Sequence, residues 1–166
     1  GVTSDGKIQC FGSNAFGASN NFKARSAVLC KSRFTAIDTT LGNTCALSFN
    51  GKLWCIGGAF TAGKNIITSN IGHFTKIAIG DRYSCGLTSH GTIQCSGVTP
   101  PKFDGQNYTD LISAPIGACA KRGKSFVCRN SGIYTSNYYQ QLISKMETFI
   151  NEGEPSEVDI GADNLL

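Results

Sequence analysis

A pair of cysteines about ten residues apart recurs along this chain of 166 residues, and no other feature limits its fold as strongly. The stretches CALSFNGKLWC (45–55) and CGLTSHGTIQC (85–95) each hold two β-prone runs around a glycine turn, and CAKRGKSFVC (119–128) is one residue shorter. Asn50-Gly51 between such runs predicts a β-hairpin with a type I′ turn, in which both central residues have positive φ. A hairpin would bring the two cysteines opposite each other, at a separation that a disulfide spans. One hairpin alone is equally compatible with two buried free thiols.

A second pattern is in register with the first. An aromatic residue, followed three positions later by an aliphatic one, stands eleven residues before the first cysteine of each pair: Phe34 and Ile37, Phe74 and Ile77, Tyr108 and Leu111. The stretch GVTSDGKIQC at 1–10 matches the second half of the same unit. The chain therefore holds an internal repeat with steps of 40 and 34 residues.

Each unit has the pattern of three short strands followed by a loop rich in Gly, Asn and Ser. Strand-length runs with glycine turns and no helical periodicity indicate small antiparallel sheets. Sheets repeated about every 40 residues are typical of a β-propeller, in which each blade packs its faces on its neighbours. We therefore expect an all-β, propeller-like array of four-stranded antiparallel blades over residues 1–133, with about three and a half repeats.

The pattern F-x-x-I, then C-x-L-x-x-x-G-x-x-x-C-x-G, resembles the repeat of the regulator of chromosome condensation family. It stands here as FTAI…CALSFNGKLWCIGG and FTKIAIG…CGLTSHGTIQCSG, and FGSNAFGASN is similar to the end of that repeat. The resemblance covers residues 1 to about 132 and implies a seven-bladed propeller used as a binding platform. The paired cysteines are most similar to the disulfide-bearing extracellular branch, such as the ectodomains of Crinkly-type receptor kinases. Secreted bacterial propellers that inhibit β-lactamases share the repeat.

Eight cysteines, six of them spaced as hairpin pairs, indicate an oxidising compartment. Zinc is the rival explanation, but no C-x₂-C occurs and His73 and His90 sit apart from any cluster of cysteines. We expect disulfides within the units, at Cys45–Cys55, Cys85–Cys95 and Cys119–Cys128. Cys10 lacks a partner ten residues before it, and Cys30 is the only cysteine outside the repeat pattern. We therefore expect a Cys10–Cys30 bridge, and we expect the chain to be the C-terminal part of a larger propeller.

The end of the chain differs in kind. Residues 134–152 predict an amphipathic helix that Ser136 or Asn137 could cap and that ends by Gly153. Its apolar stripe comprises Tyr139, Leu142, Ile143, Met146, Phe149 and Ile150, and we expect the Leu142/Met146/Phe149 face to be buried. The helix either packs back on the propeller or docks on another chain. Tyr134, Tyr138 and Tyr139 form either an exposed recognition surface or the contact between helix and last blade. Residues 153–166 form an acidic tail.

Charge divides the chain in two. Residues 1–145 hold all 15 basic residues and five of the 11 acids, whereas residues 146–166 hold six acids and no base. A basic platform could bind an acidic glycan or protein face, but the bases are scattered, so a solvated surface is the plainer interpretation. No basic stripe alternates with aromatic residues, so nucleic-acid binding is not expected. No run of 18 apolar residues predicts insertion into a membrane. Asn107-Tyr108-Thr109 is a glycosylation sequon that would suit a secreted loop.

No catalytic constellation is visible, because each would need a nucleophile or base with an orienting partner. His73 and His90 stand alone, and no metal or cofactor site is expected. The expected function is a non-enzymatic binding or scaffold module: a recognition or structural subunit of an extracellular or cell-surface assembly. Its partner would be a protein, other copies of such chains, or a glycan. Inhibition of an enzyme, as by the β-lactamase-inhibiting propellers, is the alternative, and nucleotide exchange or another enzymatic activity is the third.

Overall fold

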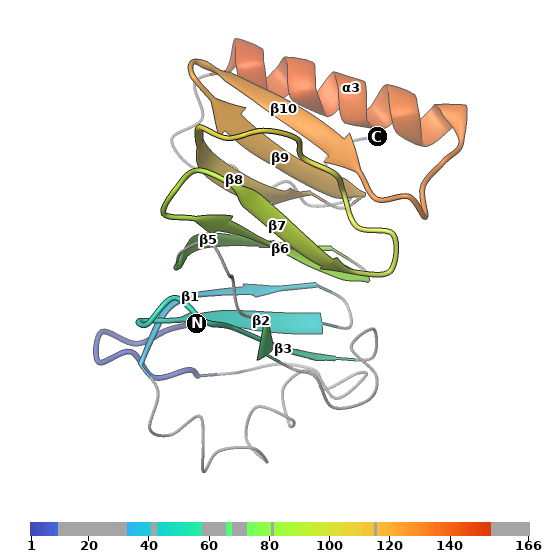
Figure 1. Ribbon diagram of the computed structural model, residues 1–166. Coiled ribbons are helices and arrows are strands. Elements are labelled where there is room, and N and C mark those ends of the chain that lie inside the picture. Colours follow the sequence, from blue (N-terminus) through green and yellow to red (C-terminus); the bar gives the residue numbers. More distant parts are fainter. Residues whose placement is uncertain are drawn as a thin grey trace.

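The computed structural model describes residues 1–9, 33–40, 43–57, 66–67, 73–80, 82–114 and 116–153. Three antiparallel sheets are stacked in chain order, and helix α3 lies on the last of them (Figure 1). The first sheet comprises β1 (Phe34–Thr39), β2 (Asn43–Ser48), β3 (Leu53–Gly57) and β4 (Ile66–Ile67). The second comprises β5 (Phe74–Ile79), β6 (Tyr83–Thr88) and β7 (Ile93–Gly97). The third comprises β8 (Tyr108–Ala114), β9 (Gly117–Arg122) and β10 (Ser125–Asn130), and α3 spans Asn137–Glu152.

The hairpins turn differently from the type I′ prediction. The amide of Gly51 donates to the carbonyl of Ser48 at 2.8 Å, and Ser48 donates to Lys52 at 2.9 Å. Only Gly51 has a positive φ, 72°, whereas Asn50 does not. This is a type I turn followed by a glycine bulge, the common three-residue hairpin loop. The spacing of the cysteines explains this turn, because Cys45 pairs directly with Cys55. Nine residues lie between them, so pairing residue by residue toward the turn leaves an odd number in the loop and excludes a two-residue loop.

The third sheet confirms the importance of this spacing. Cys119 and Cys128, nine residues apart, also pair directly, which leaves an even number of loop residues. Arg122 pairs with Ser125, so the loop consists of Gly123 and Lys124 alone. Gly123 has φ 65° at the first central position, as a type II′ turn requires. The turn is therefore at Gly123-Lys124, one residue beyond the Arg122-Gly123 pair that a direct comparison with the longer units would suggest.

The disulfide-bearing face of each sheet is buried by the element that follows it in the chain. The Cys45–Cys55 face packs against residues of the second sheet: Phe74, Ile77 and Ile79. The Cys85–Cys95 face packs against residues of the third: Tyr108, Leu111, Ala118 and Ala120. The Cys119–Cys128 face packs against α3, through Ile143, Met146 and Ile150. The helix therefore occupies the place of a following blade, and of the two alternatives it packs back on the propeller.

The expectation of four-stranded blades holds only for the first sheet within the described part of the chain. In the second sheet, Pro100 and Pro101 follow soon after β7, and proline cannot donate a hydrogen bond to a strand ladder. In the third, the chain leaves β10 and enters α3 instead of returning as a strand.

The expected buried face of α3 is partly wrong. Ile143, Met146 and Ile150 are buried, and Leu142 is half-buried. Phe149, in contrast, is 66% exposed. At roughly 100° per residue, Phe149 lies about 90° from the centre of the arc formed by the three buried residues, so it reaches past the edge of the contact. Ser136 stands at the N-cap and Gly153 at the C-cap, as the sequence predicts. The helices of the described chain include none long and apolar enough to cross a membrane.

Candidate binding surface

The hairpin turns stand in one row along the array, joined by main-chain hydrogen bonds. We call β1, β5 and β8, the first strand of each sheet along the chain, the inner strands. The first residue of each inner strand donates its amide to the carbonyl of the turn glycine of the preceding unit: Phe34 to Gly6 at 2.9 Å, Phe74 to Gly51 at 3.1 Å and Tyr108 to Gly91 at 3.0 Å. The turns are also tied to their own sheets, since Phe49 donates to the Arg33 carbonyl at 2.7 Å and Ser89 to His73 at 2.8 Å. We call the turns at 3–7, 49–52, 89–92 and 122–125, with Arg33, His73 and Asn107 between them, the hairpin-tip row.

Glycine is required in these turns for two reasons. Gly6, Gly51 and Gly91 all have φ between 72° and 79°, which L side chains rarely adopt. A Cβ on Gly51 would also lie 2.3 Å from the Cβ of His73. The glycines thus allow each unit to approach the next closely, and they hold the tip side chains at a fixed spacing.

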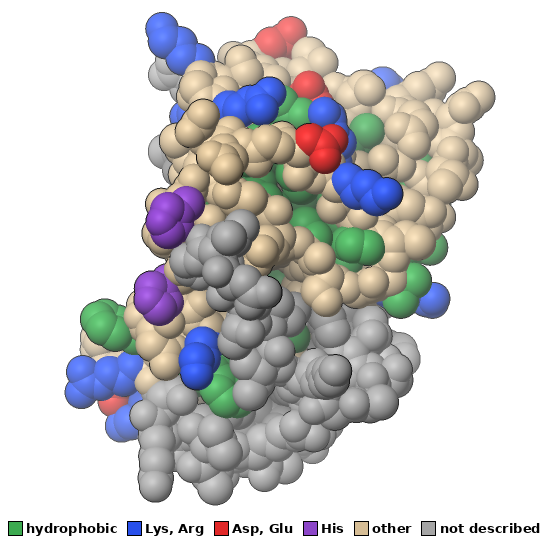
Figure 2. Space-filling view, in the orientation of Figure 1, with side chains coloured by type: hydrophobic (Ala, Val, Ile, Leu, Met, Phe, Trp, Pro, Cys, Tyr) green, Lys and Arg blue, Asp and Glu red, His purple; other side chains and the backbone are tan. Residues whose placement is uncertain are grey.

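The side chains on this row are mostly exposed. Phe49 is 81% exposed at the tip of the first complete hairpin. Polar and charged neighbours are exposed along the same row: Arg33, Asn50, Lys52, His73, Ser89, His90, Arg122 and Lys124. Figure 2 shows the two histidines, in purple, along one edge of the molecule. The structure therefore gathers at one edge residues that are far apart in the sequence.

The charges on the row are partly compensated. Asp5 forms a 2.7 Å ion pair with Lys7. Hydrogen bonds from Lys7 and Thr3 lower the pKa of Asp5 to about 2. Asp5 therefore stays ionised at physiological pH and offsets the charge of Lys7. This agrees with the interpretation of the basic residues as a solvated surface rather than a concentrated basic patch.

Of the three tyrosines, two form the contact between the helix and the last blade, and one is exposed as a recognition surface would be. Tyr134 and Tyr139 are half-buried against the third sheet and α3, with ring centroids 4.9 Å apart. Tyr138 is 56% exposed and contacts Tyr139 edge-on at 5.3 Å. The cluster therefore fastens the start of the helix to the last sheet and presents one ring to solvent.

Asn107 lies on the row, directly before β8. Its side chain is exposed, and so is Thr109 of the sequon. Asn107 has φ 71°, a conformation that asparagine tolerates better than most residues. The position is sterically open to a glycan, and its modification stays a prediction.

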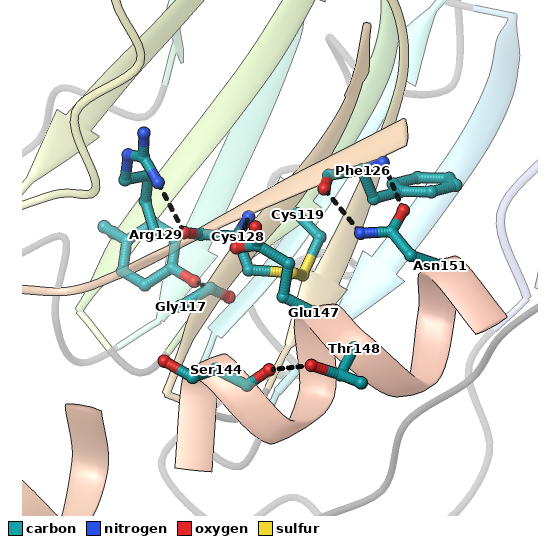
Figure 3. The surroundings of a disulfide bond; sticks show 10 residues. Gly117, Cys119, Phe126, Cys128, Arg129, Ser144, Glu147, Thr148 and Asn151 are labelled. Carbon is teal, nitrogen blue, oxygen red and sulfur yellow. Dashed lines mark hydrogen bonds between the residues drawn. A yellow bond between two sulfur atoms is a disulfide. The ribbon is translucent and has the colours of Figure 1, made fainter. Parts of the chain in front are cut away.

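The three predicted disulfides are present at Cys45–Cys55, Cys85–Cys95 and Cys119–Cys128. Figure 3 shows the last of them beneath α3. Five of these six cysteines are buried, and Cys95 is half-buried, so the bridges are part of the packing between units. Cys10 and Cys30 lie outside the described residues, and their bridge stays a prediction.

The sequence did not reveal a polar cluster on the inner strands. Asp38 of β1 accepts hydrogen bonds from the Ile79 amide at 3.0 Å and from the Ser113 hydroxyl, and thereby joins β1, β5 and β8. Nearby, the buried Tyr83 hydroxyl donates to the carbonyl of Gly117. Burial, and secondarily the charge of Asp38, raise the pKa of the Tyr83 phenol far above its ordinary value. The repeat pattern gives no signal for these residues, because they occupy different positions of their units.

Among the described residues, the hydroxyls of Thr3 and Ser113 donate to the carboxylates of Asp5 and Asp38. His73 precedes β5, while the Asp38 cluster lies near the far end of that strand, about 20 Å away along six residues. His73 therefore does not lie beside the Asp38–Ser113 pair, as a triad of nucleophile, base and acid would require. Within the described ranges, no group of three His, Cys, Asp or Glu could hold a metal ion.

Comparison with known proteins gives similarity in structure but not in sequence: no protein-family model and no curated protein matches the chain. The entire ectodomain of the Physcomitrella patens receptor kinase CR4 matches with a TM-score of 0.53 and 17% identity, over 60% of this chain and 31% of that one. Yeast RCC1 (Prp20), solved bound to Kap60, matches with a TM-score of 0.57 and 14% identity, over 76% and 40%. The chain has the fold of an RCC1-type β-propeller array. The resemblance drawn from the repeat is confirmed for the fold.

The Crinkly ectodomain of the Arabidopsis thaliana receptor kinase ACR4 is also similar, with a TM-score of 0.50 and 12% identity over 60% of this chain and 38% of that one. The chain therefore spans less than half the length of each of these three proteins as solved. At such low identities the comparison concerns the fold alone.

Proposed function

We propose that this chain is a non-enzymatic binding module of an extracellular or cell-surface assembly, and that it binds a protein partner through the hairpin-tip row. The observation that carries the proposal is Phe49, 81% exposed on a turn that main-chain hydrogen bonds hold to its neighbours. A rigid, exposed aromatic residue loses little conformational entropy on binding, and aromatic residues are enriched among interface hot spots.

The disulfides support the proposed extracellular or cell-surface location of the protein. Three hairpins are bridged, and such bridges persist in oxidising compartments and are rare in the cytosol and nucleus. Two of the similar structures are receptor-kinase ectodomains. Yeast RCC1 was solved bound to Kap60, so a protein that contains this fold can bind a protein partner.

The test compares two exposed phenylalanines. The chain, Phe49→Ser and Phe149→Ser are immobilised without reductant and exposed to secreted proteins from the native source. Captured proteins are quantified by mass spectrometry. We expect one partner to be captured by the parent chain and by Phe149→Ser, and to fall at least roughly tenfold with Phe49→Ser, the loss typical of a hot-spot truncation. A captured glycan, or capture that is indifferent to Phe49, would overturn the assignment to a protein partner at this row.

A further inference from the structure

Side chains of α3 satisfy the outer edge of β10. The Asn151 Oδ1 accepts the Phe126 amide at 2.7 Å, and its Nδ2 donates to the Phe126 carbonyl at 3.0 Å. The Glu147 Oε2 accepts the Cys128 amide at 2.9 Å (Figure 3). The edge of a sheet normally presents such groups unpaired, as a template for another strand. Here one side-chain amide forms both hydrogen bonds that a neighbouring strand would supply at Phe126.

The first sheet shows what α3 replaces. Leu53 in β3 stands two residues before the second cysteine of its unit, as Phe126 does in β10. Leu53 pairs with Ile67 of the fourth strand β4. Asn151 thus takes the position that a fourth strand takes in the first sheet.

The helix also covers the adjoining face. Met146 is 1% exposed and Ile150 2%, both packed in the cluster that holds Cys119 and Cys128. In the two earlier units a following sheet covers this face. One helix therefore replaces two different neighbours: the fourth strand of its own sheet and the face of the next.

We propose that α3 is an autoinhibitory cap that occupies a strand-accepting site on β10, and that the other occupant of this site is β10 of a second copy. Two β10 strands related by a two-fold axis at Val127 would place Phe126 opposite Cys128 of the partner copy. The outward groups of both residues would then form the reciprocal hydrogen bonds of an antiparallel pair. Ser125 would face Arg129, so no like charges would oppose each other. The cap favours the monomer because it satisfies the same edge within one chain.

The test keeps the full chain and removes the strand-like hydrogen bonds with Asn151→Leu/Glu147→Leu. Gln141→Leu/Lys145→Leu is the matched control, because both of its positions are exposed on the same helix. We expect amide exchange at Phe126 and Cys128 to rise at least roughly tenfold in the first variant when it is dilute, and to stay unchanged in the control. In sedimentation equilibrium, we expect the first variant to dimerise at high concentration and the control to remain monomeric.

A charge reversal then identifies the occupant. In the uncapped background, Ser125→Glu places opposite charges against Arg129 of the other copy and should strengthen dimerisation. Ser125→Arg places like charges there and should weaken it. Two outcomes overturn the proposal: an uncapped variant that stays monomeric with exchanging β10 amides, or self-association that ignores the charge at position 125.

Discussion

One position shows how neighbouring units solve the same contact differently. The residue after the first cysteine is Ala46 in the first sheet, Gly86 in the second and Ala120 in the third. A Cβ on Gly86 would lie 2.4 Å from the ring of Phe74, which is buried. The second sheet therefore accommodates Phe74 at the expense of a side chain at position 86.

Gly86→Ala should accordingly destabilise the protein by about 1–3 kcal/mol, because the added methyl group overpacks a closed core. Chemical denaturation of the oxidised protein measures this. The same substitution is made in a Phe74→Leu background, where the ring is absent, and we expect Gly86→Ala to cost at least about 1 kcal/mol less there. An equal cost in the two backgrounds would contradict the steric explanation.

The burial of the Tyr83 phenol predicts that the stability of the fold depends on pH. Its pKa is raised in the folded state, so the phenol keeps its proton there, while in the unfolded chain it releases the proton near pH 10. The stabilisation is complete below pH 10 and is lost as the pH rises above it. The advantage of the parent over Tyr83→Phe, about 1 kcal/mol at pH 8 from the hydrogen bond to Gly117, should fall by about 1.4 kcal/mol per pH unit above 10. An advantage that stays constant up to pH 11 would contradict this assignment.

The turns show that the spacing of the cysteines predicts loop length better than the Asn-Gly motif does. Asn50-Gly51 is the usual signal for a type I′ turn, yet the ten-residue cysteine step already excludes a two-residue loop if the cysteines face each other. The same counting assigns Gly123-Lys124 to the shorter hairpin. Both loop lengths were therefore predictable from the sequence. The Asp38–Ser113 bond was not, because it depends on how strands 75 residues apart are stacked.

Among the elements, the bounds of α3 were the easiest to predict from the sequence. The face that it turns toward the third sheet was the hardest. Its apolar periodicity and terminal Gly153 indicate the helix and its end. Six apolar residues, however, cover a wide arc, and the sequence alone does not show which of them face the sheet. The sheet decides this, since Asn151 and Glu147 must also reach the edge of β10.

Two charge insertions test the orientation of this helix. Met146→Asp should destabilise the protein by at least about 3 kcal/mol or detach the helix, because the new charge is buried without a partner. Phe149→Asp should cost less than about 0.5 kcal/mol, as for an ordinary exposed position. Helical circular dichroism and denaturation measure both. Similar losses of stability in the two variants would indicate that Phe149 is buried, as in the Leu142/Met146/Phe149 face expected from the sequence.

At the scale of the whole molecule, the described array is a stack in which each unit contacts mainly the next. In such repeat structures, stability is the sum of each unit's own stability and its interfaces with neighbours. Here the interfaces are extensive: every disulfide face is buried by its successor, and the tips are joined by main-chain hydrogen bonds. A single hairpin is only marginally stable alone. These interfaces should therefore make the array unfold as one cooperative unit.

Gly86→Ala tests this, because it damages only the middle sheet. The Phe74 amide, bonded to Gly51, reports on the junction of the first and second sheets, and the Tyr108 amide, bonded to Gly91, on that of the second and third. If the array is cooperative, both amides should exchange only through global unfolding, and the variant should lower their opening free energies by the same amount as its measured loss of stability. The Ser131 amide, bonded to the Ile116 carbonyl beside the third sheet, should follow them, although it lies two interfaces away from the first sheet. An unchanged opening free energy at Ser131 would show instead that the third sheet forms a separate folding unit.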